Sequence, residues 1–384
     1  MDVLKGLPDN SVDSVVTDPP YGLSKEPDIK EVLTKWLDGE EYDHGHKGFM
    51  GKSWDSFVPH PDIWKEVYRV LKPGGHALVF AGTRTQDLMT VSLRLAGFEV
   101  RDVIEWLYFT GFPKSMDVSK AFDKRDGIWR GRAGKVVSTN VSMSAPNYER
   151  SPKGEAVGEL ARKWDGWGTA LKPAHEPIIV VRKPLHDGKK LTVADCVEKY
   201  GTGAININVC RIGEEELKGQ KRGNAKNVSF QSGGYTPDRE GRFPANCVTL
   251  DEDQFYSKYF NVSAVANVSP AELSKKASKK DRNSDWQGNE IGLEVHQADG
   301  LQGRADGSLG KKTYNRNTHP TVKPTDLMAW LIRLITPPNG IILDPFAGSG
   351  STLVAAKREG FDYIGIEMTP EYVEIAKART GEAV

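Results

Sequence analysis

Near the start of the chain, a carboxylate, two prolines and an aromatic ring follow one another at Asp18, Pro19, Pro20 and Tyr21. The apolar run over 11–16 comes after a turn signal and predicts a buried strand that ends directly before Asp18. Ligands of open α/β sheets bind beyond the carboxyl ends of the strands. The motif is therefore expected at the mouth of a site.

The chemistry of this motif suits the exocyclic amine of a nucleic-acid base. Proline has no N–H, so the backbone here offers carbonyl acceptors, and the Asp18 carboxylate adds a further acceptor beside the Pro19 carbonyl. Tyr21 provides a flat ring on which an extruded base can stack. Taken alone, the four residues are at least as compatible with an ordinary turn that places Tyr21 in the core.

A glycine-rich loop near the other end of the chain predicts a nucleotide-type cofactor site. A strand is expected over 340–343, a helix over 351–359 and a second strand over 363–366 that ends at Glu367. Glycine permits close backbone approach, helix-start N–H groups favour a polar ligand end, and the acid accepts hydrogen bonds from ribose hydroxyls. A tight turn without a ligand is the alternative. The loop consists of Asp344, Pro345, Phe346, Ala347, Gly348, Ser349, Gly350 and Ser351.

With the Asp-Pro-Pro-Tyr motif first and the glycine loop last, the chain resembles the permuted, beta-class amino-group DNA methyltransferases, and most of all their phage and prophage adenine-N6 members. The resemblance implies an α/β fold, in which a Rossmann-like, doubly wound, mostly parallel sheet is circularly permuted and carries an inserted target-recognition region. It also implies S-adenosyl-L-methionine as the cofactor bound by the loop and by Glu367. The catalytic residues implied are Asp18, Pro19, Pro20 and Tyr21.

Two further segments match the same family. The sequence His-Pro-Thr-Val-Lys-Pro at 319–324 precedes an amphipathic run over 326–335. The resemblance implies that this segment packs over the methionine end of the cofactor through His319, Thr321 and Lys323, although His319 is also compatible with an ordinary loop. In the segment 166–184, His175 and Glu176 invite an acid–base interpretation, but a cap at the start of a strand is the simpler interpretation and the one favoured here.

The pattern divides the chain into a split catalytic domain and an insert. Residues 1–184 form one half, with strands expected near 12–17, 76–81, 101–108 and 176–182, and helices near 60–71 and 84–96. Residues 311–384 form the cofactor-binding half, and 185–310, with short strand candidates at 204–209 and 247–250, correspond to the target-recognition region of the family. An irregular insertion over 112–174 is locally basic and predicts DNA contact, with a solvated loop as the alternative. Its cations are Lys114, Lys120, Lys124, Arg125, Arg130, Arg132 and Lys135.

A second basic run has helical spacing and fits either a stripe along a DNA groove or a solvated helix. It consists of Lys275, Lys276, Lys279, Lys280 and Arg282. One departure from the family concerns the first residues, where members have a strand ending in an acid that binds the adenine of the cofactor. Because Asp2 lies too close to Leu4 to replace it, an incomplete adenine pocket is expected, with one sheet edge exposed or covered by a partner.

Composition excludes several classes of protein. The 384 residues contain 52 Lys and Arg against 52 Asp and Glu, so any DNA-binding face must be local rather than global. The 3 cysteines form no Cys-x-x-Cys pair, which argues against structural zinc and a disulfide framework, and no metal site is expected. No apolar stretch has membrane-spanning length and no signal peptide is visible, so the expected location is the cytoplasm of a bacterial or phage-infected cell.

The reaction expected is direct methyl transfer to the exocyclic N6 amine of a flipped adenine in double-stranded DNA, without a covalent enzyme intermediate. By resemblance, Asp rather than Ser at position 18 favours adenine N6 over cytosine N4, which stays the alternative. A catalytically impaired, methyltransferase-like DNA-binding protein is the alternative from another class. RNA and protein-glutamine methyltransferases usually have the opposite motif order. A homodimer and a cognate restriction endonuclease are the further partners that the resemblance suggests.

Overall fold

The computed structural model describes residues 1–23, 26–45, 56–108, 115–130, 149–150, 154–218, 239–250, 282, 293–296, 312–315 and 317–382. The chain forms two compact units. The larger unit consists of Met1–Phe109 and His175–Val384, and the smaller one of Thr110–Ala174.

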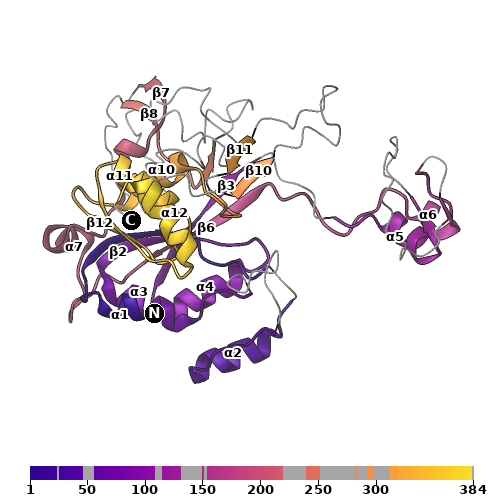
Figure 1. Cartoon of the computed structure of the whole chain (residues 1–384). Coiled ribbons are helices and arrows are strands. Elements are labelled where there is room, and N and C mark those ends of the chain that lie inside the picture. Colours follow the sequence, from indigo (N-terminus) through magenta and orange to yellow (C-terminus); the bar gives the residue numbers. More distant parts are fainter. Residues whose placement is uncertain are drawn as a thin grey trace, which may run out of the picture. The chain divides into compact units, whose positions relative to one another are not determined.

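A seven-stranded sheet forms the centre of the larger unit (Figure 1). The strand order is β13-β12-β1-β2-β6-β3-β9, and every neighbouring pair is parallel except the two pairs that involve β6. This mostly parallel α/β sheet confirms the expected fold class. The strands are β1 (Val12–Thr17), β2 (Leu71–Phe80), β3 (Glu99–Leu107), β6 (His175–Arg182), β9 (Cys247–Thr249), β12 (Ile341–Asp344) and β13 (Asp362–Gly365).

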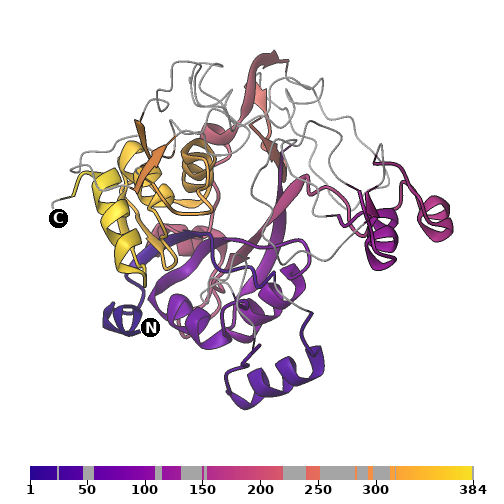
Figure 2. The same cartoon turned by 45° about the vertical axis from the view of Figure 1, so that its right-hand side comes forward.

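Alternate side chains of the buried strands enter two separate cores, as the two-residue period of a strand requires. Val16 of β1 packs in the core that contains α10 (Thr325–Ile335) and α11 (Ser351–Arg358). Its neighbour Val15 packs in the core on the other face, with α1, α3 and α4. Helices therefore cover both faces of the sheet (Figures 1 and 2). The bounds of the second group are α1 (Asp2–Gly6), α3 (Pro61–Val70) and α4 (Gln86–Leu95).

One expectation about local structure is wrong and another is extended. The amphipathic run over 326–335 forms α10, which is buried at nine positions between the sheet and the segment that contains η3 (Asn208–Cys210). Residues 204–209 form no strand but lead into η3, where the Asn206 N–H donates to the Leu334 carbonyl at 2.7 Å. The candidate at 247–250 does form a strand, β9, and this strand extends the main sheet beside β3.

The remaining elements of the larger unit lie around this framework. Helix α12 packs on α11, and α7 packs on β2. Strands β7 and β8 pair antiparallel, as do β10 and β11. These elements are α2 (Ile29–Asp38), α7 (Val193–Tyr200), β7 (Ile212–Leu217), β8 (Arg239–Arg242), β10 (Leu293–His296), β11 (Lys312–Asn315) and α12 (Pro370–Thr380). No helix in the described part of the chain is long and apolar enough to cross a membrane.

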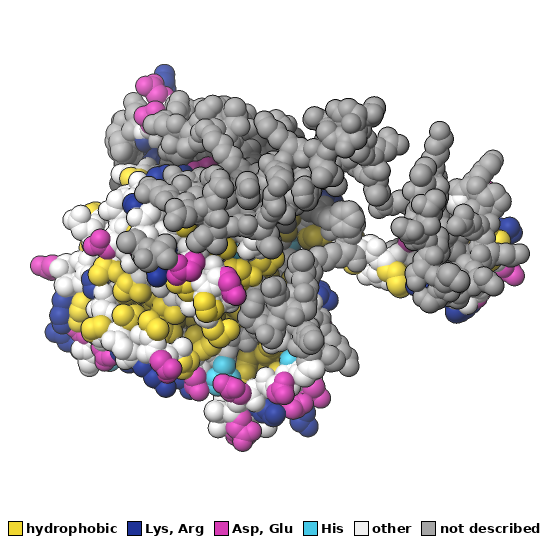
Figure 3. Space-filling model, viewed as in Figure 1, with side chains coloured by type: hydrophobic (Ala, Val, Ile, Leu, Met, Phe, Trp, Pro, Cys, Tyr) yellow, Lys and Arg dark blue, Asp and Glu magenta, His cyan; other side chains and the backbone are white. Residues whose placement is uncertain are grey.

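Strand β13 is an edge of the sheet. Among the described strands, only β12 pairs with it, and Asp362 and Gly365 at its two ends are exposed. Hydrophobic side chains gather on the viewed face of this unit between α12 above and α1 and α3 below (Figure 3). Tyr363 and Ile364 of β13 are only partly buried hydrophobic residues.

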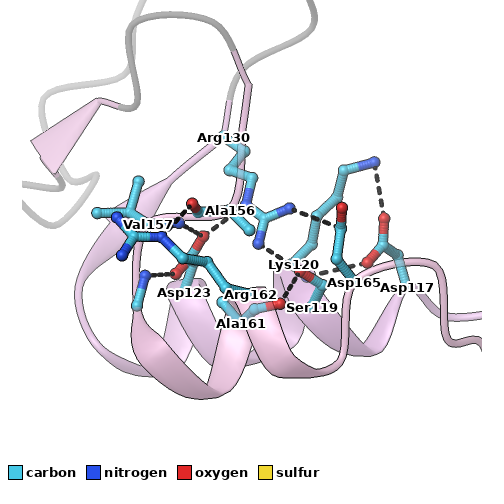
Figure 4. A network of polar contacts seen from close by, with 11 residues as sticks. Asp117, Ser119, Lys120, Asp123, Arg130, Ala156, Val157, Ala161, Arg162 and Asp165 are labelled. Carbon is cyan, nitrogen blue, oxygen red and sulfur yellow. Dashed lines mark hydrogen bonds and ion pairs between the residues drawn. The ribbon is translucent and has the colours of Figure 1, made fainter.

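The smaller unit is built around a buried ion pair (Figure 4). Its elements are α5 (Val118–Arg125), β4 (Ile128–Trp129), β5 (Glu149–Arg150) and α6 (Glu159–Lys163), so the stretch expected to be irregular contains two helices. Arg130 Nε donates to Asp123 Oδ2 at 2.5 Å, and the same carboxylate accepts the N–H groups of Val157 and Gly158. Asp123 thereby links α5 to the start of α6.

Several basic residues singled out above lie outside the described residues, namely Lys114, Arg132, Lys135, Lys275, Lys276, Lys279 and Lys280. Arg282 is described, and its guanidinium donates to the carbonyls of His319 and Pro320 at 3.0 and 3.4 Å. This arginine therefore supports the loop at His319 rather than standing in a free basic stripe. In the smaller unit, Lys120, Lys124 and Arg125 are exposed.

Candidate active site

Two neighbouring strands bring the sequence motifs from the two ends of the chain together. β1 and β12 are parallel, with Ser14 opposite Ile342 and Val15 opposite Leu343. Their carboxyl ends lie at the same end of the sheet, so the Asp-Pro-Pro-Tyr motif after β1 and the glycine loop after β12 are neighbours.

Asp344, the last residue of β12, connects the two loops. The Thr17 hydroxyl donates to Asp344 Oδ1 at 2.6 Å, and the Thr352 hydroxyl donates to Oδ2 at 2.5 Å. The Phe346 N–H adds a bond of 3.1 Å to Oδ1. Burial raises the pKa of Asp344 to about 6, although the hydrogen bonds from Thr17 and Thr352 oppose the shift. Both oxygens of Asp344 therefore hold the framework of the loop, and direct cofactor contact by this residue stays a prediction.

The glycine loop has a backbone that only glycine adopts readily at two positions. Gly348 and Gly350 have φ angles of +52° and +80°, in the left-handed region. A Cβ on Gly348 would lie 3.0 Å from His319 Nε2, and one on Gly350 would lie 3.0 Å from the Ala376 Cβ. A side chain at either position would meet neighbouring atoms of the protein itself, so both glycines are needed for the packing of the loop, and close approach of a cofactor there stays a prediction.

Glu367 lies where the sequence places the ribose-binding acid. Its Oε2 accepts the Gly348 N–H at 2.9 Å, and its Oε1 accepts the Thr369 N–H at 2.8 Å. A carboxylate has about four lone-pair sites, so these two bonds fix its orientation and leave capacity for hydroxyl donors. The loop and Glu367 thus match the needs of a nucleoside-containing cofactor.

Arg379 supports the glycine loop, and the sequence did not identify it as a site residue. It is 1% exposed, and its Nη1 donates to the Ser349 carbonyl at 2.8 Å and lies 3.2 and 3.3 Å from the hydroxyls of Ser349 and Ser351. An arginine in the last turn of a helix is normally interpreted as a favourable partner of the helix dipole. Only the fold of α12 against α11 reveals its contact with the loop.

His319 packs against the glycine loop, and its contact with the cofactor, which the resemblance implies, stays a prediction. Its ring Nδ1 lies 2.9 Å from the Thr321 carbonyl, and the ring meets Tyr372 edge-on at 4.5 Å between centroids. Burial lowers the pKa of His319 to about 4. The imidazole is therefore neutral at physiological pH. Its Nδ1 lies 2.9 Å from the Thr321 carbonyl and 3.3 Å from the Thr321 N–H, and the tautomer decides whether it donates to the first or accepts from the second. Thr321 itself is exposed.

Lys323 lies at the other motif. Its Nζ is 2.5 Å from Asp18 Oδ2, 3.1 Å from the Tyr21 hydroxyl and 3.3 Å from Glu176 Oε2. The Tyr21 hydroxyl donates to Glu176 Oε2 at 3.0 Å. We name these four residues the carboxylate–lysine group. Glu176 is the second residue of β6 and joins this group, so the interpretation of Glu176 as a strand cap is wrong. His175 points elsewhere, 3.6 Å from Glu105.

The charges of this group depend on one another. Burial raises the pKa of Asp18 above its ordinary value, while the Lys323 ammonium opposes the shift and Glu176 adds to it. Burial disfavours the charged form of Lys323, yet Asp18 and Glu176 hold its pKa above the ordinary value. The pKa of Tyr21 lies well above its usual range because of burial and the two carboxylates, so its hydroxyl stays protonated. The Lys323 ammonium partly neutralises the negative charge of the Asp18 and Glu176 carboxylates.

One atom of the group is unsatisfied. Asp18 Oδ1 is buried and, among the described residues, has no hydrogen-bond partner, whereas Oδ2 is held by Lys323. Burying a carboxylate oxygen without a donor is costly. The site therefore contains a fixed acceptor that faces no donor from the described part of the protein.

The remaining predicted residues surround these contacts. Phe346 turns toward the opposite core, where its ring lies 5.8 Å from that of Trp64. Ala347 packs with Leu353 and Ala376 under the loop. Pro19 is buried, and Pro20 is half-buried directly before Tyr21. The Tyr21 carbonyl accepts the Thr85 hydroxyl at 2.6 Å, which fixes the end of the motif.

Comparison with known proteins shows the family to which the chain belongs. A model of the DNA methylase family, of the N6 and N4 type, matches residues 12–378. The chain belongs to this family. It is therefore a DNA methyltransferase of the N6 and N4 type, which confirms the broader part of the resemblance. The permuted class, the adenine preference and the phage relationship stay predictions.

Individual relatives of the methylase agree with this assignment. Type II methyltransferase M.HindIII of Haemophilus influenzae is 24% identical over 396 residues, covering 98% of this chain and 92% of that protein. Putative methylase YubD of Escherichia coli is 49% identical over 71 residues, which are 18% of this chain and only 31% of YubD.

Solved structures that resemble the methylase include the putative DNA modification methylase TTHA0409 of Thermus thermophilus, with a TM-score of 0.41 at 17% identity over 99% of this chain and 90% of that one. They also include the cytosine-N4-specific PvuII DNA methyltransferase, with a TM-score of 0.45 at 14% identity over 98% of this chain and 82% of that one.

Proposed function

We propose that this DNA methylase transfers a methyl group from S-adenosyl-L-methionine to the exocyclic N6 amine of an adenine flipped out of double-stranded DNA. The observation that carries the proposal is the buried Asp18 Oδ1 at the carboxyl end of β1, which no described residue pairs. An unpaired buried acceptor costs about 1–3 kcal/mol, which an incoming N–H donor recovers. An amine is such a donor.

The residues of this chain then carry the reaction by position and charge. The lone pair of an exocyclic amine is delocalised into the ring, so the nitrogen is a weak nucleophile. Hydrogen bonds from its two N–H groups to Asp18 Oδ1 and to the Pro19 carbonyl favour a pyramidal nitrogen with a directed lone pair. In this proposal the Tyr21 ring, tethered through its hydroxyl to Glu176, stacks on the base. After transfer, the nitrogen carries one proton too many, and Asp18 Oδ1 is the acceptor that faces it.

The cofactor fits the glycine loop on the grounds given above. S-adenosyl-L-methionine supplies a methyl group bonded to a positively charged sulfur when it is bound there. In this proposal the loop backbone approaches the cofactor at Gly348 and Gly350, Glu367 accepts its ribose hydroxyls, and His319 lies against the loop as a neutral ring. Thr321, Lys323 and Asp344 were expected to contact it too; their contacts within the protein favour supporting roles.

The test combines product analysis with one variant. The protein is incubated with unmethylated double-stranded DNA and labelled S-adenosyl-L-methionine, and the DNA is hydrolysed to nucleosides for mass spectrometry. N6-methyladenine is the expected product. Detection of N4-methylcytosine instead would show that the target is the N4 amine of cytosine. Asp18→Ala should abolish product while calorimetry shows unchanged cofactor affinity. Binding of both cofactor and DNA without any methylated product would instead mark a DNA-binding protein without this activity.

The partners follow from the same proposal. Double-stranded DNA is the proposed substrate, and the proposed location of the reaction is the cytoplasm of a bacterial or phage-infected cell. A homodimer and a companion restriction endonuclease stay predictions from the resemblance.

A further inference from the structure

The position of Lys323 raises a question that the methyl-transfer chemistry alone does not answer. Its segment was expected to serve the cofactor, but its ammonium lies 2.5 Å from Asp18 Oδ2 and 3.3 Å from Glu176 Oε2. The side chain is only 9% exposed, and the ammonium also lies 4.9 Å from the centre of the Phe80 ring and 5.2 Å from that of Tyr21. Such a site holds the ammonium in one place.

The hydrogen bonds of Lys323 fix the orientation of Asp18. A carboxylate held at one oxygen by a buried donor can rotate little, so the direction of the other oxygen is set as well. Oδ2 is the oxygen that Lys323 holds, and Oδ1 is the buried oxygen without a partner among the described residues. Lys323 therefore determines where the amine acceptor points.

Glu176 in turn holds Lys323 and Tyr21. Its Oε2 lies 3.3 Å from the Lys323 ammonium and accepts the Tyr21 hydroxyl at 3.0 Å, and the Tyr108 hydroxyl is a further hydrogen-bond partner. Glu176 lies at the start of β6, whereas Asp18 follows β1 and Lys323 precedes α10. Three elements far apart in the chain thus converge on one set of charges.

We propose that Lys323 and Glu176 are positioning residues of the methyl-transfer site: Lys323 holds Asp18 Oδ2 so that Oδ1 is directed at the target amine, and Glu176 anchors both Lys323 and the Tyr21 ring. This inference rests on the proposed function. It assigns Lys323 to the base side of the site, whereas its place in the sequence suggested the cofactor side.

Opposite charges on the two residues give the proposal opposite pH signatures. The groups that face Asp18 are Lys323, Glu176, the Tyr21 hydroxyl and the more distant Asp344. Removing the Lys323 charge takes away the main influence that lowers the pKa of Asp18, and removing the Glu176 charge takes away one that raises it. Because methyl transfer needs Asp18 ionised, the acid limb of the kcat–pH profile reports these changes.

The variants are Lys323→Met, Glu176→Gln and, as a matched control on the exposed surface of α3, Lys65→Met. With the full-length protein and double-stranded DNA, Lys323→Met should move the acid limb to higher pH and lower kcat by up to about 100-fold. Glu176→Gln should move the limb to lower pH. Lys65→Met should leave both unchanged. Calorimetry with S-adenosyl-L-methionine should give the same Kd for all three variants as for the unsubstituted protein.

Several results would overturn the inference. An acid limb that stays in place in both active-site variants would show that these residues act only as packing, and a large loss of cofactor affinity in Lys323→Met would return Lys323 to the cofactor side. If Lys323→Met does not fold, Glu176→Gln alone tests the inference. Its acid limb must move to lower pH, and general damage to the site would not extend activity to lower pH. Failure of the proposed function is separate, since it would appear as turnover by Asp18→Ala.

Discussion

At the scale of single residues, the site depends on atoms whose partners are far away in sequence. Thr17 and Asp344 are joined by a hydrogen bond of 2.6 Å, although one residue ends β1 and the other ends β12. Lys323 reaches Asp18 across a similar separation. The Asp-Pro-Pro-Tyr motif and the glycine loop were predictable from local sequence because each is contiguous. The contacts of Lys323, Glu176 and Arg379 were not, because no local pattern encodes a meeting of distant segments.

Gly348→Ala should weaken binding of S-adenosyl-L-methionine. The new Cβ would lie 3.0 Å from His319 Nε2 at a φ of +52°, so the loop or His319 must shift, at a cost of about 1–3 kcal/mol in folding stability. A displaced loop should bind the cofactor more weakly. Gly360→Ala is the matched control, since its φ is +78° but nothing lies within 4 Å of its Cβ. Calorimetric titration compares the two. Equal affinities in both variants would show that the loop does not need the space at Gly348.

Asp344→Asn should change how stability depends on pH. The pKa of Asp344 is raised to about 6 by burial, against an ordinary value of 3.8. Between pH 3.8 and about 6, the Asp344 carboxyl is protonated more fully in the folded protein than in the unfolded chain. Its contribution to stability is therefore present at low pH and is lost as pH rises through about 6. The effect is about 3 kcal/mol.

The variant should therefore gain stability relative to the unsubstituted protein as pH rises from about 4 to 6, measured by urea unfolding at several pH values. Asparagine can still bond the hydroxyls of Thr17 and Thr352, because each hydroxyl can donate or accept. A constant difference between the two proteins across this range would refute the assigned pKa shift. Asp38→Asn, at the exposed end of α2, serves as the control.

At the scale of elements, the periodicity of the apolar residues predicted most strands of the sheet and two of the helices that cover it. The strands β1, β2, β3, β6, β12 and β13 and the helices α3 and α4 occur within a few residues of the expected ranges. The burial of α10 on its outer side was not predictable, because the segment that covers it lies more than a hundred residues earlier in the chain. β9 was placed in the insert because a strand of three residues carries no sign of the neighbour it pairs with.

Arg130→Ala should destabilise the smaller unit, whereas Arg125→Ala should not. Arg130 is 4% exposed and pairs with the fully buried Asp123, so its loss leaves a buried carboxylate unpaired and costs about 3–5 kcal/mol. Arg125 is 61% exposed and pairs with Asp126 on the surface, where such pairs contribute about 0–1 kcal/mol. Hydrogen exchange within 110–174 of the full chain measures the difference. Equal protection in the two variants would show that the buried pair does not hold this unit together.

At the scale of the whole molecule, two compact units share one chain, and only the larger one contains the site. The smaller unit, 110–174, carries more Lys and Arg than Asp and Glu, although the complete chain balances 52 against 52. Such an excess suits contacts with DNA phosphates, which the sequence predicted for this stretch. The larger unit presents the other unusual feature, the edge strand β13 with its partly buried hydrophobic residues.

Replacing 110–174 with a short Gly-Ser linker should preserve cofactor binding and reduce DNA affinity. All residues assigned to the cofactor lie in the larger unit, so the Kd for S-adenosyl-L-methionine should stay the same. Removing cations that neutralise phosphates should make the slope of log K against log salt less steep, by about 0.9 for each phosphate that is no longer neutralised. Filter binding at several salt concentrations measures the slope. An unchanged slope would assign the smaller unit a role other than DNA contact.

The point at which the chain leaves the sheet has a consequence for how such an enzyme can be inherited. β3 and β6 are hydrogen-bonded neighbours, and Leu107 stands directly opposite His175, so the whole of 110–174 departs and returns between two paired residues. A stretch of DNA inserted or removed at that place leaves the strands on both sides in register. The geometry therefore permits the smaller unit to be gained, lost or exchanged as a cassette without a change in the pairing of β3 with β6.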